Sequence, residues 1–290
     1  MSAIIARAAG GCRRSRDGFT LIELLVVVAI IGLLASLLLP ALCRAKQKAK
    51  QASEFNAGRQ LMLAWQFYAD EHNDEVLPGY TSLAEAFDDQ GHPLGSPIRD
   101  RYPWRLAPYL ANNFRSIYVN ESRRFLEDAA SRAHDEYVYR ASLYPSLGYN
   151  SVFLGGDEQK FNPTLAAATF GAHWLITRGS QIRRPSGLLA FLSARSRPGD
   201  RPSGLGAFAR DESGFFVVHP PYLITRQWAP AFDTSQSPEQ FGYVDPRWNR
   251  RAVAALTDGH VESLNTAQLQ DMQRWSNGAD RPDWTLQPLP

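Results

Sequence analysis

Length, composition and charge narrow the classes of protein to which this chain can belong. The chain has 290 residues, enough for one large domain or two small ones, and its formal net charge is +2. Four arginines and one aspartate put a charge of +3 into residues 1–18, which leaves −1 for the rest of the chain. We therefore expect no nucleic acid as a partner, because a nucleic-acid-binding protein needs a concentrated basic face.

Residues 19–39 form an apolar segment that predicts a transmembrane helix. Glu23 is the only charged residue in it. At roughly 1.5 Å per residue the helix would be about 31 Å long, which matches the hydrocarbon core of a bilayer. The arginines before it are a positive-inside signal. We therefore expect a single-pass protein of the cytoplasmic (inner) membrane whose carboxyl-terminal part is extracytoplasmic, in the periplasm.

Three interpretations of this segment compete: a signal peptide, a signal anchor and a prepilin. A carboxylate near the start of an apolar run costs about 2–3 kcal/mol on insertion scales unless it is neutralised. A cut after Gly18 would create a new α-amine on Phe19, with which the carboxylate of Glu23 can pair. A conventional cut near Ala41 leaves Glu23 unexplained, so the prepilin interpretation accounts for more of the sequence.

The start of the segment resembles the type IV prepilin processing motif, with GFTLIE at residues 18–23 followed by an apolar run and Pro40. The resemblance implies cleavage after Gly18 by a prepilin peptidase and N-methylation of Phe19. It also implies that Glu23 guides assembly with other pilin or pseudopilin subunits, and that Pro40 kinks the helix.

The predicted organisation follows from this start. We expect a leader peptide at 1–18, a transmembrane helix at 19–39, the periplasmic half of the same helix at 40–74, and a globular pilin-like head at 75–290. The predicted fold class is α+β, a long helix packed on an antiparallel β-sheet, with loops and short helices inserted from about Pro78 to Thr177. The helix should end near Asn73. Apolar residues at steps of three, four or seven describe one face of this helix: Ala45, Ala49, Ala52, Phe55, Met62, Trp65 and Ala69.

Local patterns predict several elements of the head. Short helices are expected at 101–114 and 121–134, strands at 186–193 and 214–218, and a closing helix at 266–275, capped by Thr266, with Leu269 and Met272 facing inward. The clearest signal is at 252–264, where two apolar segments flank Asp258 and Gly259. This pair of residues predicts the turn of a β-hairpin.

The hairpin carries a second resemblance, to prepilin-type proteins with a C-terminal His-x9-Asp-Gly motif. Asp258, Gly259 and His260 lie where this motif ends, and Trp248 occupies the position of its histidine. The resemblance implies a divergent member of that group, in which any role that depends on an imidazole at position 248 is lost.

The sequence shows little sign of catalytic chemistry. It contains no Gly-x-Ser-x-Gly, His-Glu-x-x-His, P-loop or dinucleotide-binding pattern, so we expect no enzyme and no cofactor. An anchored hydrolase that uses Asp211 or Asp258 is a third hypothesis, after the two given in the next paragraph. Because some pseudopilins hold calcium in C-terminal loops, Asp245 and Asp258 are candidate ligands for that ion.

The sequence thus favours a non-enzymatic pilin-like or pseudopilin-like subunit of a type II secretion or type IV pilus-like system. The alternative is a membrane-anchored recognition module that binds a glycan or another envelope protein. Aromatic residues could line such a glycan surface, although packing in the core is the more ordinary role for them. They are Trp228, Tyr243, Trp248, Trp275 and Trp284.

Overall fold

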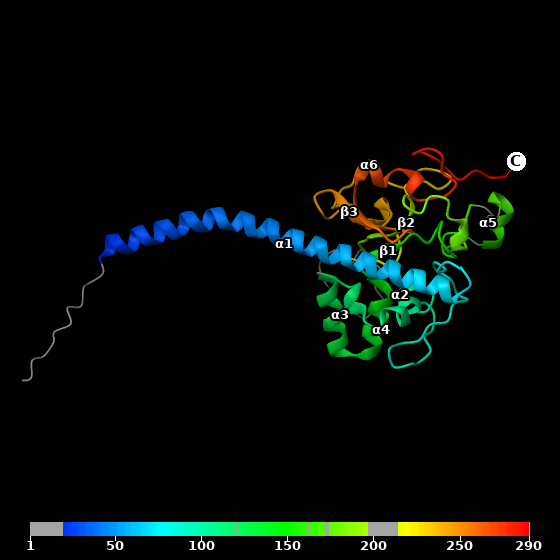
Figure 1. The fold of residues 1–290 in the computed structure, drawn as a ribbon, viewed down its shortest axis with the longest axis horizontal. Helices are drawn as coiled ribbons and strands as arrows, with labels where there is room; N and C mark the ends of the chain where they lie inside the picture. Colours follow the sequence, from blue (N-terminus) through cyan, green and yellow to red (C-terminus); the bar gives the residue numbers. More distant parts are fainter. Residues whose placement is uncertain (1–19, 120, 162, 172–173, 197–213, 290) are drawn as a thin grey trace, which may run out of the picture. The chain divides into compact units, whose positions relative to one another are not determined.

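The computed structural model describes residues 20–119, 121–161, 163–171, 174–196 and 214–289 (Figure 1). The chain divides into two units, residues 1–46 and residues 47–290. Helix α1 (Leu21–Glu71) contributes to both. It ends where Asn73 and Asp74 take positive φ angles of 53° and 69°, a backbone conformation that stops a helix. The predicted end near Asn73 is therefore confirmed.

A four-stranded sheet forms the centre of the second unit. Its strands are β1 (Leu147–Tyr149), β2 (Leu189–Ser193), β3 (Arg251–Leu256) and β4 (Val261–Asn265), in the order β1-β2-β3-β4. All neighbouring strands are antiparallel, with Gly148 opposite Leu192 and Leu192 opposite Ala254. The predicted α+β fold class is confirmed.

Residues 47–71 of α1 pack on this sheet, whereas α2, α3 and α4 group on the other side of the helix in Figure 1. Gly58 permits the close approach, because a Cβ atom there would lie 3.3 Å from the Val261 side chain and 3.4 Å from Ala255. The apolar face predicted for this helix is buried only at its far end, at Met62, Trp65 and Ala69. At its start, Ala45, Ala49 and Ala52 are exposed. The buried residues of α1 are Glu54, Ala57, Gly58, Leu61, Met62, Ala64, Trp65 and Ala69.

The segment before β2 holds most of the helices. They are α2 (Tyr102–Leu106), α3 (Glu121–Arg132), α4 (His134–Leu143), α5 (Pro163–Phe170) and the 3₁₀ turns Pro108–Leu110, Phe114–Ser116 and Gly179–Gln181. The helix predicted at 121–134 is confirmed as α3. The short helix predicted at 101–114 is confirmed only as α2, because Pro108 has no amide hydrogen and Ala111 and Asn112 take positive φ angles. The expected insertion also supplies strand β1.

The carboxyl-terminal elements follow the prediction more closely. The hairpin is confirmed as β3 and β4, with Gly259 at a φ of +94° in its turn. The strand predicted at 186–193 is confirmed over its last five residues, which form β2. The strand predicted at 214–218 is wrong, because Val217 forms only an isolated bridge with Tyr149.

The closing helix is shorter than predicted. It consists of α6 (Thr266–Leu269) and the 3₁₀ turn Met272–Arg274, and a further 3₁₀ turn spans Pro238–Phe241. Asn265, not Thr266, caps α6, because its side chain accepts from Gln268 N–H while Gln268 reaches back to Asn265. Leu269 and Met272 are buried, as predicted.

Candidate functional site

The first turn of α1 is closed by reciprocal hydrogen bonds between Thr20 and Glu23. The backbone N–H and the hydroxyl of Thr20 donate to Glu23 Oε2 over 2.9 and 2.7 Å, and Thr20 Oγ1 accepts from the Glu23 N–H over 3.3 Å. This capping box holds the Glu23 carboxylate at the amino end of the helix. Gly18 and Phe19, the predicted cleavage and methylation residues, lie outside the described residues.

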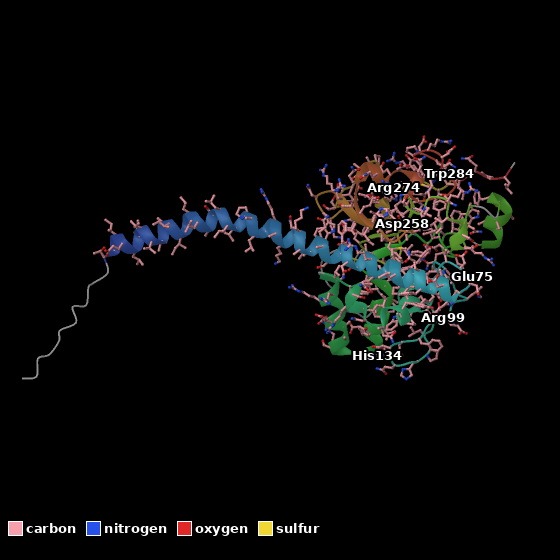
Figure 2. All side chains as sticks on the ribbon, viewed as in Figure 1. Glu75, Arg99, His134, Asp258, Arg274 and Trp284 are labelled. Carbon is pink, nitrogen blue, oxygen red and sulfur yellow. The ribbon has the colours of Figure 1, made fainter. Side chains whose placement is uncertain are left out.

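The first part of α1 exposes a continuous apolar surface. Among the described residues, α1 is the one helix long and apolar enough to cross a membrane, with a mean hydropathy of 2.9 over an 18-residue window that has no buried residue. Its side chains project outward along the helix in Figure 2. Such a surface is stable in lipid or against other subunits rather than in water. This N-terminal helix is consistent with a single-pass membrane anchor.

Pro40 lies inside α1, at the carboxyl end of the apolar segment. Proline has no amide hydrogen, so it cannot donate to the carbonyl group of Ser36 as the helix pattern requires. The Ser36 hydroxyl itself donates to Leu33 O over 2.7 Å. The kink at Pro40 stays a prediction. Arg44, a basic residue just beyond it, is exposed, as expected for a helix surface next to lipid headgroups.

A buried carboxylate links the second half of α1 to the sheet and to the segment before β3. Glu54 is fully buried and accepts hydrogen bonds from the Ser193 hydroxyl on β2 and, over 3.0 Å, from Trp248 Nε1. Arg247 Nε lies 3.9 Å from Glu54 Oε2 and 3.2 Å from Asp245 Oδ2. Burial raises the pKa of Glu54, whereas the positive charge of Arg247 acts in the opposite direction.

Trp248 therefore has a defined structural role. It is half-buried, and its indole N–H points at the carboxylate of α1. An indole, like an imidazole, presents a ring N–H donor. Trp248 thus donates a hydrogen bond to Glu54 through a ring that cannot titrate.

Asp258, Gly259 and His260 lie in and next to the turn of the β-hairpin. Asp258 Oδ1 accepts from His260 N–H over 3.1 Å and lies 2.7 Å from His260 Nδ1. Gly259 faces α1, since a Cβ atom there would lie 3.4 Å from Gln66 Nε2. The turn is thus stabilised by its own side chains and packs near the helix.

The two candidate calcium ligands lie at opposite ends of strand β2. The backbone N–H of Asp245 donates to Ser193 O, the last residue of β2, while that of Asp258 donates to Pro185 O, before the strand begins. Five residues of a strand span about 16 Å, whereas calcium ligands lie about 2.3–2.6 Å from the ion. The structure therefore does not bring these two carboxylates together.

Two of the five aromatic residues considered for a glycan surface are core residues. Trp228 and Trp275 are 3% and 0% exposed and contact each other edge to face, with ring centroids 5.7 Å apart. Trp284 and Tyr243 are half-buried, and Tyr243 stacks on Phe215 at 4.3 Å. Asp211, the other residue considered for a hydrolase, lies outside the described residues.

Glu54 is the residue that the sequence reasoning missed. A signal for it exists: Glu54 is three and seven residues before Ala57 and Leu61, in step with the buried face of α1. A charged residue at a core position indicates a hydrogen-bonded network, because an unpaired buried carboxylate is too costly to keep.

Comparison with known proteins finds a family match at the start of the chain. Residues 13–39 match the prokaryotic N-terminal methylation motif. The start of the chain thus carries a prepilin-like methylation motif. The chain is also 40% identical over 60 residues to fimbrial protein EcpC of Eikenella corrodens. This match covers 20% of the chain and 39% of the length of that relative, and no solved structure matches the chain.

Proposed function

We propose that this chain is a non-enzymatic, pilin-like subunit. A prepilin peptidase would cut it after Gly18 and methylate Phe19, and the mature protein would assemble with other pilin or pseudopilin subunits in a type II secretion or type IV pilus-like system. The observation that carries the proposal is the methylation motif at residues 13–39, which includes the exposed apolar part of α1. The head would then lie outside the cytoplasmic membrane.

The position of Glu23 supports this proposal. In the uncut chain its carboxylate accepts from Thr20 and so stays at the amino end of α1. Cleavage after Gly18 would place a positively charged α-amine one residue before Thr20. That amine, from the same subunit or a neighbouring one, would neutralise Glu23 within lipid, where an unpaired carboxylate is costly.

The hydrogen bonds around Glu54 support the proposal because they join α1 to the head. Ser193 and Trp248, from two segments far apart in sequence, both donate to this one residue of α1. Residues 47–71 of the helix are thereby built into the core of the head. A subunit that joins a filament through the first part of α1 would carry the head at the carboxyl end of the same helix.

The test is the intact mass and N-terminal peptide of the chain, purified from membranes of a host that has a prepilin peptidase. We expect a protein that begins at Phe19 with one added methyl group. Gly18→Val should leave the full-length precursor, because the bulky side chain stands at the scissile bond. Gly32→Val is the matched control, since nothing lies within 4 Å of a Cβ atom there, and it should be processed normally.

A wild-type chain that still begins at Met1, or that is cut near Ala41, would contradict the proposal. The alternative function is an anchored recognition module for a glycan or an envelope protein. It predicts that the detergent-solubilised chain is retained on immobilised polysaccharide or envelope extract and that Glu23→Gln, which should abolish assembly, leaves this retention unchanged.

A further inference from the structure

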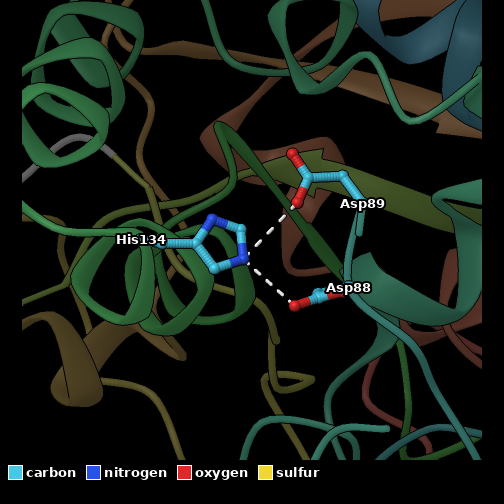
Figure 3. A group of neighbouring side chains, drawn as sticks. All are labelled: Asp88, Asp89 and His134. Atoms are coloured by element: carbon cyan, nitrogen blue, oxygen red, sulfur yellow. Dashed lines mark hydrogen bonds and ion pairs between the residues drawn. The ribbon is translucent and has the colours of Figure 1, made fainter. Parts of the chain in front are cut away.

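A cluster of one histidine and two carboxylates lies where the 85–95 loop meets the start of α4 (Figure 3). Asp88 and Asp89 come from the loop, and His134 is the first residue of the helix. His134 Nε2 lies 3.0 Å from Asp88 Oδ2 and 3.6 Å from Asp89 Oδ1. One ligand atom of each residue lies within 4.8 Å of the others. Neither the prepilin-type segment nor the Glu54 network uses these residues.

The loop holds Asp88 in a fixed orientation. Its side chain is 5% exposed, and Oδ1 accepts from the backbone N–H groups of Gln90 and His92 over 2.9 and 2.7 Å. Oδ2 is thereby turned toward His134 and toward His92 Nδ1, which lies 3.2 Å away. Backbone donors that orient a carboxylate in this way are typical of the surroundings of a metal ligand.

The spacing of these atoms suits a small tetrahedral ion. Zinc binds nitrogen and oxygen ligands at about 2.0–2.2 Å, so neighbouring ligand atoms in a tetrahedral site lie about 3.3–3.5 Å apart. The three histidine-to-aspartate separations of 3.0, 3.2 and 3.6 Å lie around this value, and the ligand atoms of the two aspartates lie within 4.8 Å of each other. Imidazole nitrogen with carboxylate oxygen favours zinc and similar transition ions, whereas calcium and magnesium favour oxygen alone.

Charge and access agree with a cation at this place. Two carboxylates meet two imidazole rings here, while the nearby Arg115 and Arg123 both face Glu127 at 3.6 and 3.9 Å. A cavity of about 420 Å³ is lined in part by Asp89 and His134, and a second of about 450 Å³ in part by Asp88 and His134. The cluster lies between two open cavities, so an ion and a water ligand can reach it.

We propose that Asp88, Asp89 and His134 bind one divalent transition-metal ion of the zinc class, with His92 or water as the fourth ligand. With the ion on Nε2 of His134, its Nδ1 carries the proton and needs an acceptor. The Gln90 side-chain amide lies 3.3 Å from Nδ1, and its oxygen supplies that acceptor when the amide is turned. The ion would fasten the loop to α4, independently of the proposed role in a filament.

The test is a zinc chloride titration of the full chain in detergent, without a polyhistidine tag, followed by competition with a chelating dye. Cys12→Ser and Cys43→Ser are included, because thiols also bind zinc and Cys43 is exposed. We expect one zinc per chain, and binding weakened by about 10-fold or more in His134→Gln and in Asp89→Asn. Calcium should not compete at equal concentration.

The matched control is His260→Gln. His260 forms the same kind of pair with Asp258, at 2.7 Å, but no third ligand joins it among the described residues. In Figure 2, Asp258 lies on the sheet side of the head and His134 at its helical side. Zinc affinity should not change in this variant. Asp89 is partly exposed, so Asp89→Asn also tests the site without disturbing the core.

X-ray absorption at the zinc edge supplies a second readout, for which we expect nitrogen and oxygen ligands only, at about 2.0–2.2 Å. The proposal is overturned if the chain binds no zinc, if His134→Gln and Asp89→Asn bind it as tightly as the parent chain, or if His260→Gln weakens binding equally. Binding of calcium in preference to zinc would also overturn it.

Discussion

Replacing Trp248 by phenylalanine removes one hydrogen-bond donor from buried Glu54 and keeps an aromatic ring in place. The lost bond joins Trp248 Nε1 to Glu54 Oε2 over 3.0 Å. A hydrogen bond to a charged group contributes about 1.5–3 kcal/mol to stability. Ser193 still donates to Glu54 in the variant, so the carboxylate keeps a partner. We therefore expect Trp248→Phe to lower the free energy of unfolding of the head by about 2 kcal/mol.

The assay is chemical denaturation followed by fluorescence and circular dichroism, with three comparison variants. Trp284→Phe makes the same change at a half-buried position and should cost less. Trp248→His keeps a ring N–H and should lose less stability than Trp248→Phe. Glu54→Gln, alone and combined with Trp248→Phe, completes a double-mutant cycle, and a coupling energy of about 0.5–3 kcal/mol is expected for residues in contact.

Two results would refute this reasoning. One is a cost for Trp248→Phe no larger than that for Trp284→Phe, because packing alone would then explain the loss. The other is a coupling energy near zero between Trp248 and Glu54. Either result would mean that the indole N–H does not stabilise the buried carboxylate.

Three further predictions concern the same helix. Burial raises the folded-state pKa of Glu54 above its unfolded value, so ionisation of this side chain destabilises the fold. The free energy of unfolding should therefore fall as the pH rises from the ordinary glutamate range through the raised pKa. Denaturation at several pH values should show that Glu54→Gln removes this dependence. Gly58→Val should cost about 1–3 kcal/mol by overpacking against β3 and β4, whereas Gly32→Val, where nothing is near, should leave the unfolding of the head unchanged, as thermal melts would show. A soluble head that begins at Gln47 should unfold cooperatively, whereas one that begins at Pro78 lacks the buried residues of α1 and should not, which proteolysis and circular dichroism can compare.

Features that depend on neighbours in sequence were predictable. The apolar segment, its leading GFTLIE string and Pro40 are read from consecutive residues, and the hairpin from the Asp258 and Gly259 pair, because a turn needs only a residue that tolerates positive φ. The helix predicted at 101–114 is shorter than expected, and the reason is also local. Pro108 interrupts it, although the residues around Pro108 are apolar.

Features that depend on contacts between distant segments were not predictable. The residues at 214–218 have strand-like composition, yet the backbone of Val217 pairs only with Tyr149, so no strand forms. The apolar steps of α1 include Ala52, which is exposed, whereas Glu54 is buried on the same face as Gly58, four residues further on.

The sequence by itself determined the apolar helix and the methylation motif, because both depend on a continuous stretch of chain. Only the tertiary structure decided which polar side chains meet. Glu54 and Trp248 are 194 residues apart, and Asp88 and His134 are 46 residues apart. The reason is that a buried or clustered charge is stable only where the fold brings a partner to it, and no local pattern encodes that distance.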